Sequence, residues 1–147
     1  LGQFLKAGFH IDLKREKDAI AKAIRNLSIK AKNPDLDVTS MSGGNQQKVV
    51  IGKALMTGPK VLLMDEPSRG IDVGAKADVF RTMRRLAGEG LAILFSTSDL
   101  EEVMALSDRI AVMSNGRLVT VVDRKDATEE MIISASAEGH KTKRMHA

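Results

Sequence analysis

The sequence predicts an α/β fold with a mostly parallel sheet, flanking helices, a leading helical segment and a late β-hairpin. Two short aliphatic runs, Val61–Met64 and Leu91–Phe95, have the composition of buried strands, and a helical pattern follows each. Strands that alternate with helices favour parallel pairing. Two further apolar runs flank Asn115-Gly116, the strongest short-range signal for a hairpin.

The segment before the first strand is expected to be helical. Apolar residues at three- and four-residue steps predict an amphipathic helix from Asp12 to about Lys30, and Asn33-Pro34-Asp35 interrupts this pattern. Ser42-Gly43-Gly44-Asn45 then precedes a second predicted helix, from Gln46 to about Met56. Gly58-Pro59 ends that helix.

After the first strand, the pattern predicts three more helices and the hairpin. The helices are expected at about Ala75–Ala87, Leu100–Leu106 and Thr128–Ala135, and the hairpin strands at Arg109–Met113 and Leu118–Val122. We therefore expect a helical subdomain over residues 1–57, an α/β core over 58–136, and a disordered basic tail over 137–147.

The composition is that of a globular protein, with 43% hydrophobic and 29% charged residues. No apolar run approaches the roughly 20 residues that a membrane-spanning helix needs. No charged-then-apolar leader is visible. The absence of cysteine excludes disulfides and thiolate metal sites. Because the chain starts at Leu1 without a methionine, we expect it to be a fragment of a longer protein.

The positive charge does not indicate a nucleic-acid partner. Lys141, Lys143 and Arg144 carry three of the positive charges behind the net +4, and all three lie in the predicted tail. The chain has no Trp or Tyr and only four Phe, so the aromatic platforms of single-strand binders are also scarce.

Two adjacent acids, Asp65 and Glu66, end the first predicted strand. The carboxyl ends of parallel strands form the edge at which such folds bind ligands. One carboxylate suits Mg²⁺, which takes few protein ligands, and the other can orient or deprotonate an attacking water. The alternative is that Asp65-Glu66-Pro67 only starts a turn and caps the next element.

A second candidate is the predicted helix start at Ser42-Gly43-Gly44-Asn45-Gln46. Paired glycines allow backbone N–H groups to approach a phosphate closely, and a helix N-terminus adds partial positive charge. The Ser42 hydroxyl can donate a hydrogen bond as well. The alternative is an ordinary helix cap with a glycine turn.

The phosphate-binding pattern G-x-x-x-x-G-K-S/T does not occur in the chain. In the nearest match, Gly52-Lys53, Gln47 stands in place of the first glycine and Ala54 in place of the hydroxyl. This segment therefore does not hold a nucleotide in that cradle.

A third motif, Ser68-Arg69-Gly70-Ile71-Asp72, follows the two acids directly. Taken alone it is a loop that ends in an Asp cap. The order and spacing of the glycine helix start, the acid-tipped strand and this loop are together highly specific.

These three motifs resemble those of the ATP-binding subunits of ABC transporters. Met41–Gln47 resembles the signature motif of that family, Val61–Glu66 its Walker B strand, and Ser68–Asp72 its D-loop. The resemblance runs from about Asp37 to Asp123. It implies a partial P-loop NTPase fold of the ABC ATPase type.

The variant residues are similar to one branch of the family. Asn45–Val50 and Pro67–Lys76 resemble the second ATPase half of bacterial importers of the ribose, xylose and galactose type. The chain would then be the C-terminal part of a second nucleotide-binding domain. The cradle and the glutamine loop, N-terminal in this family, are not in the chain.

The resemblance implies roles for single residues. Asp65 would hold Mg²⁺ through water, and Glu66 would be the general base that hydrolyses the terminal phosphate of ATP. Asp72 would couple two ATP sites across a dimer interface. The terminal phosphate would be contacted by Ser42, Gly43 and Gly44. The full set of nucleotide-binding residues would also include Asn45, Gln46 and Asp72.

The sequence departs from the family pattern at two positions. Asn45 stands where the common signature has glutamine, as in the sugar-importer branch. Ser98 stands before Asp99 where the switch histidine is expected, and serine lacks the proton-tunable imidazole. With Glu66 kept and Ser98 in the catalytic position, the sequence leaves open whether this ATP site hydrolyses or regulates.

The resemblance also implies a function, partners and a location. The whole protein would hydrolyse ATP to power monosaccharide import, peripherally bound to the cytoplasmic face of the inner membrane. Its partners would be permease subunits, a second nucleotide-binding domain and, indirectly, a periplasmic sugar-binding protein. The early helical part would dock on the permease, and the fragment alone would be inactive because it lacks the cradle.

Two alternatives from other classes remain at this stage. An ATPase of DNA maintenance shares these motifs, but it would need coiled-coil arms, and the sequence has no sustained heptads. A non-catalytic docking module is the other. An unpaired sheet edge would also let a second copy of the fragment pair with the first as a homodimer.

Overall fold

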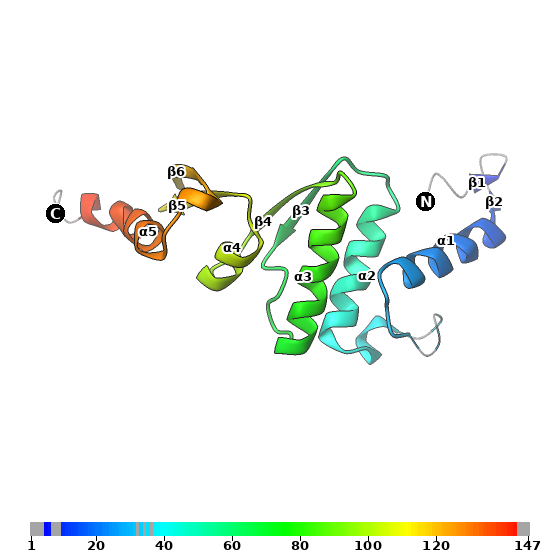
Figure 1. Ribbon diagram of the computed structural model, residues 1–147. Helices are drawn as coiled ribbons and strands as arrows, with labels where there is room; N and C mark the ends of the chain where they lie inside the picture. The colour runs from blue at the N-terminus through cyan, green and yellow to red at the C-terminus, as the bar shows by residue number, and fades with distance from the viewer. Residues whose placement is uncertain (1–4, 7–9, 32, 34, 36, 144–147) are drawn as a thin grey trace. The chain divides into compact units, whose positions relative to one another are not determined.

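The computed structural model describes residues 5–6, 10–31, 33, 35 and 37–143 (Figure 1). The chain forms two compact units, Leu1–Ser96 and Thr97–Ala147. The first contains β1 (Leu5–Lys6), β2 (His10–Ile11), α1 (Leu13–Asn26), the 3-10 turn η2 (Val38–Ser40), α2 (Gly43–Leu55), β3 (Val61–Asp65), α3 (Val73–Gly88) and β4 (Ala92–Ser96). The second contains α4 (Leu100–Leu106), β5 (Arg109–Ser114), β6 (Arg117–Asp123), the 3-10 turn η3 (Arg124–Asp126) and α5 (Glu129–Lys143).

The first helix, α1, ends earlier than the apolar pattern suggests. Ser28 has a φ of 50°, its N–H donates to the Arg25 carbonyl at 3.1 Å, and the Ile29 N–H donates to the Ile24 carbonyl at 2.9 Å. This is the Schellman arrangement, which stops a helix and turns the chain. Leu27 and Ile29, on either side of Ser28, are buried.

Helices α2 and α3 lie side by side and form the core of the first unit (Figure 1). Their apolar residues Ile51, Val79, Met83 and Leu86 are buried. A Cβ on Gly44 would lie 2.4 Å from the Ala75 Cβ, so the two helices approach closely near their starts. The glycine is what permits that approach.

Strands β3 and β4 pair in parallel, with Val61 opposite Ala92 and Asp65 opposite Ser96. This confirms the predicted parallel pair. Strand β3 ends one residue later than expected, and β4 is shifted by one residue from the expected Leu91–Phe95. Leu62 is buried, whereas Leu63 and Leu94 are 70% and 63% exposed. Within the described residues, one face of this pair therefore stays open.

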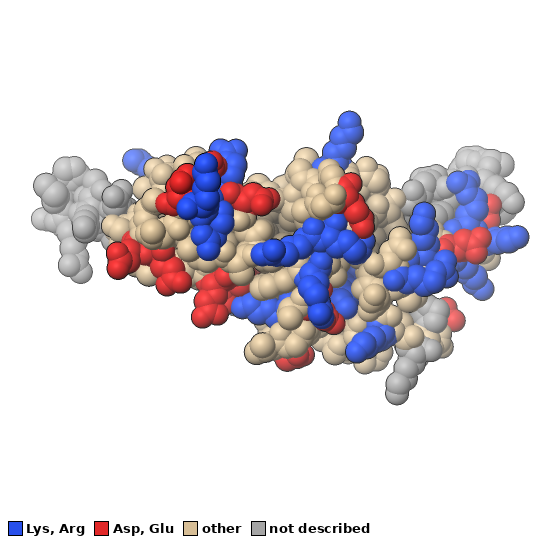
Figure 2. Space-filling view, viewed as in Figure 1, with Lys and Arg blue, Asp and Glu red and all other residues tan. Residues whose placement is uncertain are grey.

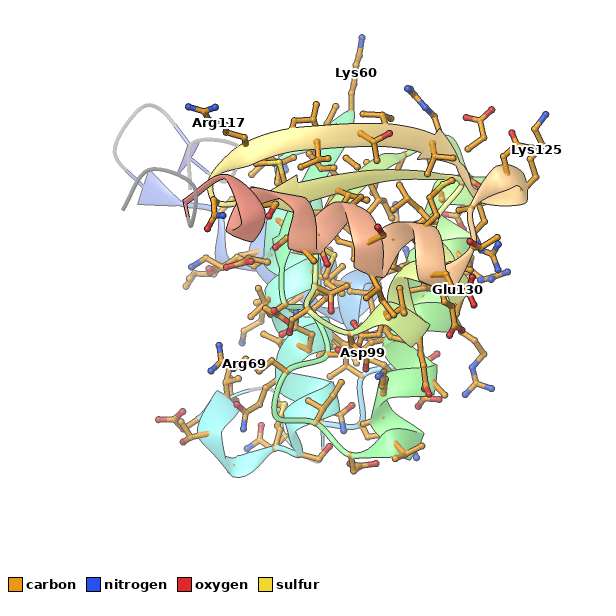
Figure 3. All side chains as sticks on the ribbon, turned by 90° about the vertical axis from the view of Figure 1, so that its left-hand side faces the viewer. Lys60, Arg69, Asp99, Arg117, Lys125 and Glu130 are labelled. Atoms are coloured by element: carbon orange, nitrogen blue, oxygen red, sulfur yellow. The ribbon has the colours of Figure 1, made fainter. Side chains whose placement is uncertain are left out.

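The second unit is a hairpin covered by a helix. Strands β5 and β6 pair antiparallel around Asn115-Gly116, as predicted, with a bulge at Val112/Met113. Helix α5 packs on β5, and Figure 3 shows it along the hairpin, with Arg117 and Lys125 near opposite ends of β6. The buried cluster consists of Ile110, Val112, Ala127, Ile132 and Ala135.

Helix α5 continues to Lys143, into the segment that the sequence predicted as a tail. Residues 144–147, with Arg144 among them, lie outside the described residues. The domain boundaries at 57/58 and 136/137 stay predictions. No helix in the described part of the chain is both long and apolar enough to cross a bilayer.

Candidate functional site

The start of α2 carries the first candidate group. Ser42 is exposed and occupies the N-cap position, but its side chain makes no capping hydrogen bond. Its carbonyl instead accepts from the N–H groups of Asn45 and Gln46, at 2.9 and 3.0 Å. The Ser42 hydroxyl is therefore not committed to the helix as an ordinary cap would be.

The two glycines bring the start of α2 against the loop before α3. A Cβ on Gly43 would lie 2.9 Å from Cγ2 of Ile71, just as one on Gly44 would meet Ala75. Gly44 is buried and Gly43 is half-buried. Close packing thus accounts for both glycines, and it joins two of the predicted motifs, Ser42–Gln46 and Ser68–Asp72.

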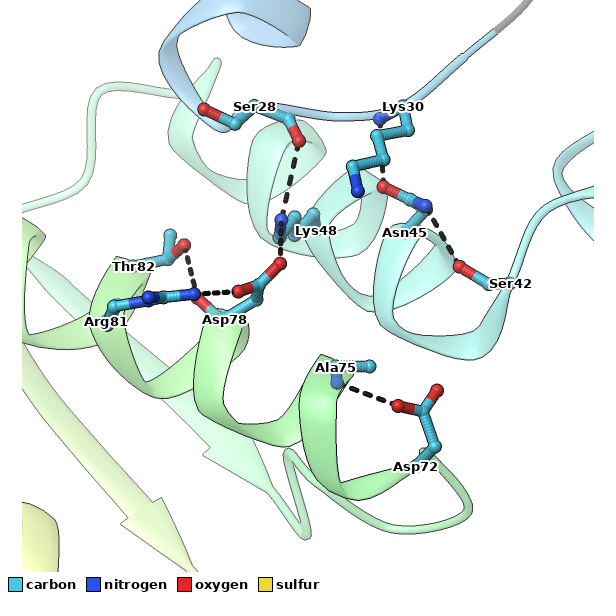
Figure 4. A network of polar contacts seen from close by, with 10 residues as sticks. All are labelled: Ser28, Lys30, Ser42, Asn45, Lys48, Asp72, Ala75, Asp78, Arg81 and Thr82. Carbon is cyan, nitrogen blue, oxygen red and sulfur yellow. Dashed lines mark hydrogen bonds and ion pairs between the residues drawn. The ribbon is translucent and has the colours of Figure 1, made fainter.

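The amides of Asn45 and Gln46, both predicted to bind nucleotide, are engaged within the chain. Asn45 Oδ1 accepts from the Lys30 N–H, and Asn45 Nδ2 donates to Ser42 Oγ, both at 2.9 Å (Figure 4). Gln46 Nε2 donates to the Met41 carbonyl at 2.9 Å. Sequence reasoning missed Lys30, because nothing local marks a contact across fifteen positions.

The acid pair lies at the end of β3, as the sequence predicts. Asp65 is the last strand residue and is exposed, and its carboxylate accepts a hydrogen bond from the Ser96 hydroxyl. The Glu66 N–H donates to the Ser96 carbonyl at 2.9 Å. Ser96 was also missed, although its register opposite Asp65 follows once the strands are aligned.

Glu66 has a φ of 45°, in the left-handed region that residues other than glycine seldom occupy. Its carbonyl accepts from the Arg69 N–H at 3.1 Å, which closes a turn directly after the strand. Such strained backbone costs roughly 1–3 kcal/mol and tends to occur at functional sites. The chain thus turns directly after Asp65, at the second of the two acids.

Asp72 is the N-cap of α3, where its carboxylate accepts from the Ala75 N–H at 2.9 Å (Figure 4). The capping interpretation of this residue is therefore confirmed. Its role in coupling two ATP sites stays a prediction.

Ser98 lies in the second unit, in the loop between β4 and α4. It is exposed, and its neighbours are tightly hydrogen-bonded. The Thr97 hydroxyl donates to Glu102 at 2.9 Å and accepts from the Asp99 N–H at 3.1 Å. Glu102 is only 2% exposed, so the loop is anchored on a buried carboxylate. A common site for Ser98 and the acid pair stays a prediction.

A cluster of charged side chains lies between α2 and α3 (Figure 4). Lys48, 5% exposed, places its Nζ 3.5 Å from Oδ2 of Asp78 and 3.4 Å from the Ser28 carbonyl. Arg81 donates to the other Asp78 oxygen. That hydrogen bond, and then the charge of Lys48, hold the pKa of Asp78 below its usual value.

The cluster borders a cavity of about 320 Å³. Arg85 Nη2 donates to the Asn26 carbonyl there, at 2.9 Å. Figure 2 shows basic side chains, with acidic ones among them, across the visible face of the molecule. The cations within the cavity lining are already paired, so the cluster ties α1 to α2 and α3. The cavity is lined by Asn26, Leu27, Ser28, Lys48, Asp78, Arg81, Thr82 and Arg85.

The residues at the end of β3 fit the magnesium ion that the sequence predicts. One oxygen of the exposed Asp65 carboxylate accepts from Ser96, which leaves the second oxygen and the neighbouring hydroxyl as hard donors. Mg²⁺ takes one or two carboxylates and keeps most of its waters, so this sparse donor set suits it. The described residues contain no group of three or more His, Cys, Asp or Glu that could hold a metal.

Comparisons with known proteins bear on this arrangement. Residues 4–69 match the family described as ABC transporter. The ribose import ATP-binding protein RbsA of Geobacillus kaustophilus is 42% identical over 141 residues, which are 96% of this chain and 28% of the relative. RbsA 1 of Streptomyces coelicolor is 56% identical over 99 residues, or 67% of this chain and 20% of the relative. The chain thus spans less than a third of the length of these relatives.

Solved structures agree at the level of the fold. An ATP-binding cassette of an ABC transporter is 27% identical, with a TM-score of 0.71 over 82% of this chain and 49% of that one. A second structure, an inward-facing conformation of a putative metal-chelate type ABC transporter, is 20% identical with a TM-score of 0.74. The match covers 82% of this chain and 48% of that transporter chain. The predicted fold class and family resemblance are confirmed.

Proposed function

Because this chain is related to the ATP-binding proteins of ABC transporters over nearly its whole length, we propose that it supplies two loops of an ATPase that powers monosaccharide import. These are the signature loop at Ser42–Gln46 and the acidic loop at Asp65-Glu66. The observation that carries the proposal is the contact of Gly43 with Ile71. It supports a single folded unit in which the glycine helix start and the segment after the acids are held together.

In this proposal Glu66 acts on water. Its left-handed backbone starts the turn after Asp65. The Glu66 carboxylate serves the water, and the Asp65 carboxylate serves the metal. Glu66 orients the water and takes its proton as the water attacks the terminal phosphate of ATP. Asp65 would hold Mg²⁺, and the ion, when bound, would offset the charge that develops on the phosphates.

Ser42 and the first-turn N–H groups of α2 bind the terminal phosphate of an ATP whose cradle lies on a partner nucleotide-binding domain. The first N–H groups of a helix lack intrahelical partners and favour anions. Ser98, in the position of the switch histidine, can donate a hydrogen bond to a terminal phosphate, but it cannot change its charge as an imidazole does. Asp72 couples the two sites through the loop that it caps.

The wider assignment follows from the same premise. The complete protein lies on the cytoplasmic face of the membrane, with the helical part of the first unit against permease subunits. A periplasmic sugar-binding protein delivers the sugar and acts indirectly. This chain alone contains no G-x-x-x-x-G-K-S/T pattern, so in isolation it should show no measurable ATP hydrolysis.

The test is Glu66→Gln in the full-length protein that carries this chain. Loss of a positioned general base costs typically 10²- to 10⁴-fold, so we expect ATP turnover to fall by about 100-fold or more. Glu89→Gln is the matched control, because Glu89 is exposed at the end of α3, where its carboxylate pairs with Arg85 on the surface. Wild-type turnover in the Glu66→Gln protein would sink the proposal.

A further inference from the structure

The orientation of the Asn45 amide is fixed by its surroundings. The Lys30 N–H is a backbone donor, so the atom of Asn45 that lies 2.9 Å from it must be the acceptor, Oδ1. The NH₂ group then necessarily faces Ser42 Oγ, also at 2.9 Å. Lys30 itself follows directly on Ile29, which is buried at the end of the Schellman turn, so the anchor is held in place.

This orientation determines what the Ser42 hydroxyl can do. A serine hydroxyl has one hydrogen to donate and two lone pairs that accept. Because the Asn45 amide donates to Ser42 Oγ, it occupies a lone pair and leaves the hydroxyl hydrogen for another acceptor. Ser42 is exposed and makes no capping bond, so that hydrogen can point outward from the helix start.

We propose that Asn45 is a positioning residue, which holds the Ser42 hydroxyl as an outward-facing donor to the terminal phosphate, and does not itself contact the nucleotide. This rests on the proposed function. It changes the role of Asn45 from the one that the family resemblance implies, since its Oδ1 and Nδ2 each already make a hydrogen bond within the chain. A hydroxyl that is oriented before binding loses less entropy when it meets a phosphate oxygen.

The hydrogen bond from Lys30 also connects Asn45 to the end of α1. Lys30 belongs to the chain that leaves α1, so the Lys30–Asn45–Ser42 contacts link the end of α1 to the phosphate-binding hydroxyl. A displacement of α1 relative to α2 that separates Lys30 from Asn45 would break this hydrogen bond and release the amide. The phosphate donor would then lose its orientation.

A double-mutant cycle in the full-length protein tests this role. We expect Ser42→Ala and Asn45→Ala each to lower kcat by about tenfold, since a hydrogen bond to a charged group is worth roughly that much or more. The double variant should be no slower than Ser42→Ala alone, because Asn45 acts through Ser42. Asn26→Ala is the matched control, an exposed asparagine at the end of α1 whose side chain lies outside the proposed contacts.

A second readout does not depend on turnover. Amide hydrogen exchange at Lys30, measured on this chain, should speed up in Asn45→Ala and stay unchanged in Ser42→Ala, because only the first removes the acceptor.

The outcomes separate the two proposals. If Ser42→Ala leaves kcat unchanged, the role of Ser42 in the proposed function fails. If Ser42→Ala slows turnover and Asn45→Ala does not, or if the two losses multiply in the double variant, the positioning role is overturned while the ATPase assignment stands.

Discussion

The two loops proposed to act on ATP are supported in opposite ways. The start of α2 is held by contacts within the chain: glycine packing on Ile71 and Ala75, and the amide of Asn45. The end of β3 stands on a pair of strands that has Leu63 and Leu94 exposed on one face. It also carries the strained backbone of Glu66.

This difference teaches which of the two loops the chain holds in place by itself. The signature loop is closely packed against its neighbours, so changes in its packing should lower the stability of the fold. The acidic loop is set by backbone conformation at one residue and by a sheet with one open face. Substitutions in the acidic loop or on the open face should therefore change the free energy of unfolding less than overpacking at α2.

Gly44→Val should have the largest effect on stability. The added Cβ would lie 2.4 Å from the Ala75 Cβ, which is bonded to helix backbone and cannot move aside. Overpacking of this kind costs typically 1–3 kcal/mol, and we expect about 3 kcal/mol here, measured by urea unfolding of the chain. Gly88→Ala is the control, since a Cβ there meets nothing within 4 Å. Equal stability of the two variants would contradict the close approach of α2 and α3.

Glu66 offers the corresponding experiment on the acidic loop. With φ at 45°, Glu66→Gly should be more stable than Glu66→Ala by about 1 kcal/mol, because only glycine adopts this conformation without steric cost. Both variants lack the carboxylate, so their difference isolates the backbone. The free energies of unfolding decide it, and an alanine variant as stable as the glycine one would argue against strain.

The same contrast explains what the sequence could predict. Periodicity and end signals are local, so helix α2, the strand that ends at Asp65 and the hairpin at Asn115-Gly116 follow from them. Helix α2 nevertheless begins at Gly43, before the predicted Gln46. The contact of Lys30 with Asn45 is not local, and no propensity encodes it. Gly43 and Gly44 suggested phosphate binding, but only the structure reveals the neighbours that require them. Ser28 ended α1 early because a left-handed turn formed at a residue that is not glycine.

An ion pair also stabilises the contact of α2 with α3, and its contribution to stability should depend on pH. Hydrogen bonding from Arg81 and the charge of Lys48 lower the pKa of Asp78 in the folded chain. Ionised Asp78 therefore stabilises the fold at any pH above its unfolded pKa, near 3.9, and this contribution is lost as pH falls through the lower folded value.

The stability advantage of the wild type over Asp78→Asn should accordingly shrink as pH is lowered from about 5 towards 2. Urea unfolding at several pH values measures it. Because this carboxylate is accessible to solvent, the effect should be smaller than either backbone change. A stability difference that does not vary with pH would show that ionised Asp78 does not stabilise the fold.

The smallest effect on stability should come from the open face of the β3–β4 pair. Leu63→Thr and Leu94→Thr, opposite each other in the parallel register, remove exposed apolar surface and should change the free energy of unfolding by no more than about 0.5 kcal/mol.

The two substitutions should instead affect the association of the chain with a second copy. If a second copy of this chain covers the open face or the adjoining strand edge, the wild type will form dimers by light scattering, and the double variant will be displaced towards monomer. Leu62→Thr, in the same strand but buried, is the control that should lose stability instead. A wild type that stays monomeric at every concentration would show that the acidic loop keeps its position without any cover on this face.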